Sequence, residues 1–79
     1  MRQATRSIVI TFENTTSAIA MERFCEELHL PGRIAPLPSV LRAGCGMCYK
    51  APIEAEDEIM NALDQNPAIL WDEMYELDF

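Results

Sequence analysis

Cys45 is the residue most suited to chemistry in this sequence, because a glycine flanks it on either side, Gly44 and Gly46. Glycine carries no side chain, so the backbone can turn sharply there and another molecule can approach the sulfur. The thiolate is the nucleophilic form of cysteine, and positive charge from the nearby Arg42 or Lys50 would raise its fraction. The same two glycines would also suit a tight β-turn without chemistry. The loop is therefore a candidate reactive-thiol site, with Gly44, Gly46 and Arg42 as candidate binding residues.

Cys48 forms a Cys-x-x-Cys pair with Cys45. This spacing is typical of dithiol–disulfide exchange, with Cys48 as a possible resolving thiol, or of half a tetrahedral metal site. A zinc site needs four ligands. The remaining candidates are Cys25, which lies on an apolar helix stripe and is interpreted as a buried structural thiol, and His29, interpreted as a surface residue. We expect no metal ion, and a strand over residues 46–50 would hold Cys48 away from Cys45.

Composition limits the classes of function. The 79 residues, 49% apolar and 24% charged, predict one small globular domain over residues 1–79. The net charge of −7 repels phosphate backbones, so nucleic-acid binding is not expected. No apolar run approaches the ~18–20 residues that span a bilayer, so no membrane association is expected. Three cysteines, an odd number, argue against a secreted disulfide framework and predict a cytoplasmic protein with reduced thiols.

Hydrophobic periodicity predicts the elements that position the loop. Pro36 lacks an N–H and places its strand at the edge of a sheet. The order strand, helix, strand, strand, helix, strand predicts an α+β, ferredoxin-like βαββαβ fold, an antiparallel sheet with two helices on one face. The expected strands cover residues 7–12, 33–37, 46–50 and part of 68–79, and the expected helices cover 18–28 and 53–65.

Over most of its length the sequence resembles a small bacterial and archaeal family labelled putative selenium/sulfur carrier-like. The resemblance implies that Cys45 is the carrier thiol, and that the partners are a sulfur or selenium donor and an acceptor protein. Two departures stand out: Ser39 and Arg42 occupy exchanged places relative to the family pattern, and Cys48 is an addition to which no carrier role transfers. The matching pieces are Val9-Ile10-Thr11-Phe12, Thr15-Thr16, Ala20-Met21-Glu22, Leu30-Pro31-Gly32-Arg33, Pro36-Leu37-Pro38 and Ala43-Gly44-Cys45-Gly46.

A carrier needs an exposed thiol and a docking surface, so we expect a carrier or binding protein without cofactors, not an enzyme. Two alternatives remain open: a dimeric ligand-binding or regulatory module that uses the sheet face, and a Cys45–Cys48 thiol-redox protein. The acidic final strand with Trp71 and Tyr75, on a domain with a small core, also predicts a homodimer through sheet faces or edges.

Overall fold

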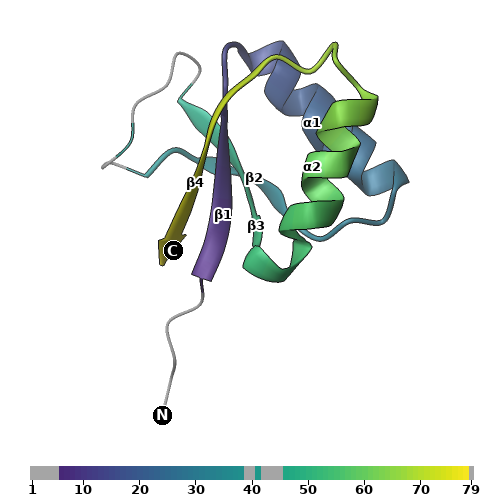
Figure 1. Ribbon diagram of the computed structural model, residues 1–79. Coiled ribbons are helices and arrows are strands. Elements are labelled where there is room, and N and C mark those ends of the chain that lie inside the picture. Colours follow the sequence, from purple (N-terminus) through teal and green to yellow (C-terminus); the bar gives the residue numbers. More distant parts are fainter. Residues whose placement is uncertain (1–5, 39–40, 42–45, 79) are drawn as a thin grey trace.

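A computed structural model describes residues 6–38, 41 and 46–78. Figure 1 shows one twisted sheet with both helices packed on the same side of it. The elements in chain order are β1 (Arg6–Phe12), α1 (Thr15–Glu27), β2 (Arg33–Pro36), β3 (Met47–Pro52), a short 3₁₀ helix η1 (Ile53–Ala55), α2 (Glu56–Gln65) and β4 (Trp71–Asp78).

The strands lie in the order β2-β3-β1-β4, and each neighbouring pair is antiparallel. The α+β class is confirmed, with a four-stranded antiparallel sheet and two helices. The strand order places β3 between the two strands that α1 connects, and β1 between the two that α2 connects. β2 is an edge strand, as the position of Pro36 predicted.

β1 is buried on both faces of the sheet, from Ser7 to Phe12. Its alternate residues pack against the helices, because side chains along a strand alternate between faces. We call the face turned away from the helices the open face; Ser7, Val9 and Thr11 of β1 lie on it. The helix-side core consists of Ile8, Ile10, Phe12, Tyr49 and Ala51 from the sheet with Ala18, Met21, Cys25, Ala55, Ile59, Leu63 and Ile69.

Several element boundaries differ from the expected ones for local reasons. α1 begins three residues early because the Oδ1 of Asn14 caps it, accepting a hydrogen bond from the Ser17 amide at 2.8 Å. β3 begins only at Met47, since Gly46 has a φ of +70°, and it extends to Pro52, which pairs with Ser7. Residues 53–55, expected as α-helix, form the 3₁₀ turn η1 that leads into α2. Within the described residues, no helix is long and apolar enough to cross a membrane.

Candidate functional site

The two ends of the predicted reactive loop meet at the end of the β2–β3 hairpin. Pro36 pairs with Met47 in the strand register, and the Leu37 amide donates a hydrogen bond to the Gly46 carbonyl at 3.1 Å. Beyond this closure, the Leu41 amide donates to the Pro38 carbonyl at 2.9 Å. The Pro36-Leu37-Pro38 motif therefore forms the base of the loop and fixes where it leaves the sheet.

The predicted carrier thiol Cys45 lies outside the described residues, as do Gly44, Arg42 and Ser39. Their roles stay predictions. Gly46, the next residue after Cys45, is described and exposed. Its φ of +70° lies in the left-handed region, which favours glycine, and a Cβ built on it would meet no atom within 4 Å. Gly46 therefore has open space where a side chain would begin.

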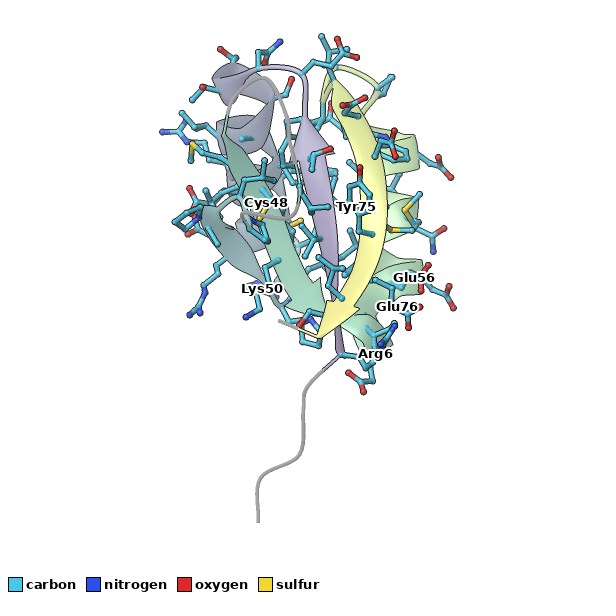
Figure 2. All side chains as sticks on the ribbon, turned by 90° about the vertical axis from the view of Figure 1, so that its left-hand side faces the viewer. Arg6, Cys48, Lys50, Glu56, Tyr75 and Glu76 are labelled. Carbon is cyan, nitrogen blue, oxygen red and sulfur yellow. The ribbon has the colours of Figure 1, made fainter. Side chains whose placement is uncertain are left out.

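Cys48 lies inside β3, as expected, between Ala35 on β2 and Thr11 on β1. Its side chain is on the open face, in the view of Figure 2, yet it is 0% exposed. The thiol donates a hydrogen bond to the Pro36 carbonyl, with a sulfur–oxygen distance of 3.7 Å. Cys48 therefore ties β3 to the residue at which the loop begins.

Cys25 is a buried structural thiol, as predicted, and is 1% exposed. Its sulfur donates to the Met21 sulfur at 3.9 Å, one turn earlier on α1. Burial raises the pKa of the Cys25 thiol, and a hydrogen bond with the Tyr49 hydroxyl lowers this pKa by a smaller amount. A buried thiol that resists deprotonation is a poor nucleophile. Among the described residues, no three His, Cys, Asp or Glu side chains gather to hold a metal ion.

The sequence analysis missed Tyr49, which organises the residues behind the loop. Its ring is 1% exposed in the helix-side core, and its hydroxyl donates a hydrogen bond to the Pro31 carbonyl at 3.2 Å. This bond joins β3 to the turn that leads into β2. The signal in the sequence is the Pro31-Gly32 turn, followed by an aromatic residue in the next strand.

The cations of β2 and β3 lie on the open face, three register pairs away from the loop base. Lys50 follows Cys48 by two residues, so both side chains are on the same face of β3, and Figure 2 shows them there. Arg33 on β2 stands directly opposite Lys50. Two cations therefore stand together at the end of β2 that is remote from the loop, in a chain whose net charge is −7.

Comparison with known proteins gives one match. No curated protein and no solved structure matches the chain. The model of the family described as "Putative Se/S carrier protein-like" matches residues 7–76, from the second residue of β1 into β4, and so includes the loop and its base. The resemblance inferred from the loop and its flanking motifs is confirmed: the chain belongs to the "Putative Se/S carrier protein-like" family.

Proposed function

We propose that the chain carries sulfur or selenium on Cys45, from a donor enzyme to an acceptor protein. Family membership supports the carrier class. The observation that carries the choice of residue is the burial of the other two cysteines: Cys25 is 1% exposed and Cys48 is 0% exposed. Neither can reach a partner's active site without local opening of the fold. Cys45 is the remaining cysteine, next to the exposed Gly46.

The transfer step needs no cofactor. The Cys45 thiolate attacks the outer sulfur of a persulfide on the donor enzyme. A new sulfur–sulfur bond forms at Cys45, the sulfur–sulfur bond on the donor breaks, and the donor leaves as a thiolate. The acceptor thiolate repeats the exchange and frees Cys45. One sulfur atom moves in each step with no net oxidation, and selenium can move in the same way.

The loop base supports this function by fixing where the carrier thiol is presented. The Leu37–Gly46 hydrogen bond closes the segment on the end of the β2–β3 hairpin. Gly46 then turns the backbone at φ +70° immediately after Cys45. In this proposal Gly44 and Gly46 give a partner room to approach the sulfur, and Arg42 raises its thiolate fraction.

The burial of Cys48 favours the carrier over the Cys-x-x-Cys redox couple. To resolve a disulfide, the Cys48 thiol must leave the Pro36 carbonyl and bring its Cβ within ~3.5–4.5 Å of that of Cys45. Its place inside a paired strand opposes this movement. We assign Cys48 a structural role at the loop base.

Two further assignments accompany the proposal, one of the fold class and one of the cellular compartment. We assign the sheet to the ferredoxin-like class, since each β-α-β unit has a strand of the other unit between its own two strands. We also place the protein in the cytoplasm, because Cys25 and Cys48 are free thiols and a persulfide carrier needs reducing surroundings.

Anaerobic loading from a cysteine desulfurase and cysteine, read by intact-protein mass spectrometry, tests the function. The wild-type chain should gain one sulfur atom. Cys48→Ala and Cys25→Ala should load as the wild type does, and Cys45→Ala should not load. If the wild-type chain instead releases sulfide and loses two hydrogens as a Cys45–Cys48 disulfide, while Cys48→Ala keeps the added sulfur atom, the chain is a redox couple. If a folded wild-type chain gains neither sulfur from the desulfurase nor selenium from selenocysteine offered in place of cysteine, the binding-module alternative replaces the carrier.

A further inference from the structure

A continuous row of side chains crosses the open face over all four strands. The strand registers place Arg33 of β2 opposite Lys50 of β3, Lys50 opposite Val9 of β1, and Val9 opposite Tyr75 of β4. Val9 is 0% exposed, while Lys50 and Tyr75 on either side of it are half-buried. Figure 2 shows these two side chains on opposite sides of β1. The row is basic at the β2 end and aromatic at the β4 end.

The β4 end of this face is also acidic. A bulge places two residues of β4, Asp72 and Glu73, opposite the single residue Thr11 of β1. Partial burial raises the pKa of Tyr75; the Glu73 carboxylate, which forms a hydrogen bond with the Tyr75 hydroxyl, and the Asp72 carboxylate raise it further. Glu76, by contrast, faces the helix side, where it pairs with Arg6 at 3.4 Å. The open face thus has a basic half on β2 and β3 and an acidic half on β4.

The edges of the sheet are poorly suited to self-association. At the β2 edge, Pro36 has no N–H to offer to another strand. At the β4 edge, the acidic residues would meet their own copies across an edge-to-edge pairing, which costs free energy. Of the two routes to a homodimer left open by the sequence, face or edge, these features favour the face.

We propose that the open face is the interface of a homodimer whose two-fold axis runs parallel to the strands, between β3 and β1. This rotation reverses the strand order, so β2 of one subunit faces β4 of the other. Because positions along the strands are kept, Arg33 meets Tyr75 of the partner subunit, with Glu73 of the partner subunit one step away on the same face. An axis across the strands would instead set Arg33 and Lys50 against themselves.

This arrangement brings Arg33 to the acidic half of the partner subunit twice, because an isologous contact is repeated about the axis, while Lys50 faces Val9 of the partner subunit. Arginine can stack on the ring of Tyr75 and pair with the Glu73 carboxylate at the same time. Packed sheets lie about 10 Å apart with their strands within ~30° of each other, which suits side chains of this length. Since each subunit carries a net charge of −7, their mutual repulsion is offset only where the opposite halves meet.

Charge reversal tests the interface and its symmetry, independently of the carrier chemistry. The variants Arg33→Glu, Glu73→Arg and the control Arg23→Glu, an exposed arginine of α1, are compared by sedimentation velocity at micromolar concentration with reductant. Wild type and Arg23→Glu should dimerise. Arg33→Glu and Glu73→Arg alone should each weaken the dimer by at least ~10-fold. Circular dichroism checks that each variant is folded.

Mixing the two single variants gives the decisive result. In a heterodimer of Arg33→Glu with Glu73→Arg, both symmetry-related contacts again join opposite charges, so the equimolar mixture should dimerise more tightly than either variant alone. The double variant Arg33→Glu/Glu73→Arg should also recover the dimer. A monomeric wild type, or a mixture that stays monomeric, overturns the proposal. Dimers that survive both single reversals overturn it as well.

Discussion

The ring of Tyr49 lies over the backbone of Gly32, where any other residue would place its first side-chain carbon. A Cβ built on Gly32 would be 2.6 Å from the Tyr49 Cε2 and hydroxyl oxygen and 2.7 Å from its Cζ. The tyrosine cannot swing away, because it is 1% exposed and its hydroxyl is bonded to the Pro31 carbonyl. Gly32 also has a φ of +128°, which favours glycine. The Pro31-Gly32 part of the family motif therefore joins β2 to β3.

Gly32→Ala should destabilise the fold by about 3 kcal/mol, because it adds a steric clash to an unfavourable φ. Gly46→Ala is the matched control: it has a positive φ of +70° but open space around the Cβ, so it should cost only about 1–2 kcal/mol. Urea unfolding of the two variants measures the difference. Equal losses would show that Tyr49 yields to the added methyl group.

Tyr49→Phe should lower stability by about 1 kcal/mol at neutral pH, because it removes the hydrogen bond to the Pro31 carbonyl. It should also change the response to alkali. Burial and the Cys25 thiol raise the pKa of Tyr49 above its usual 10.0, so the folded chain keeps that proton where the unfolded chain loses it. The stability that the folded chain gains from this raised pKa is complete below pH 10.0 and is lost as pH rises above that value.

The free energy of unfolding, measured by urea titration from pH 8 to 11, checks this expectation. The wild type should lose stability progressively at the alkaline end, and Tyr49→Phe should lose less. A smaller fall should remain in Tyr49→Phe, because burial also raises the pKa of Cys25 above 9.0. If both chains fall in parallel, the Tyr49 hydroxyl does not titrate with unfolding.

Hydrophobic periodicity was sufficient to predict the order of the strands and helices, because each element buries one apolar stripe or run. The missing N–H of Pro36 predicted that its strand lies at an edge, since a central strand needs that hydrogen-bond donor. Boundaries depended on single hydrogen bonds that periodicity does not encode. Two such cases are which of the polar residues 14–17, all of types that favour the N-cap, caps α1, and the φ of Gly46.

The environments of the cysteines were predictable only in part. The apolar spacing on α1 identified Cys25 as buried, because the helix period selects the core side. For Cys48, strand alternation places the side chain on the open face, which suggests exposure, and yet it is 0% exposed. The Pro36 carbonyl that accepts its hydrogen bond is twelve residues away, a contact made by strand pairing. The division of the open face into a basic and an acidic half was likewise not predictable, because it depends on the register of all four strands.

Site-resolved labelling with iodoacetamide at neutral pH should modify Cys45 at least ~10-fold faster than Cys25 or Cys48. The two buried thiols react only through local opening, and Cys25 also has a raised thiol pKa. The fully unfolded chain in urea is the control, where the three rates should converge. Labelling of Cys48 at the rate of Cys45 in the folded chain would show that the loop base opens readily.

The last prediction concerns the bulge that shapes the acidic half of the open face. Thr11 bridges it with its hydroxyl, which accepts a hydrogen bond from the Glu73 amide at 3.1 Å and donates to the Glu73 carbonyl at 3.4 Å. Thr11 is 1% exposed, so water cannot easily replace these bonds. Thr11→Val keeps the shape but leaves the backbone of Glu73 unsatisfied, and it should cost about 1–2 kcal/mol.

Thr16→Val is the control for Thr11→Val. It makes the same change of side chain at a residue of α1 that is exposed. It should alter stability by less than about 0.5 kcal/mol. Amide hydrogen exchange separates a local from a global effect: in Thr11→Val, the Glu73 amide should exchange faster by more than the loss of global stability explains. Unchanged protection at Glu73, with stability equal to that of Thr16→Val, would mean that strand pairing alone holds β4 in place and that the bulge does not need the hydroxyl.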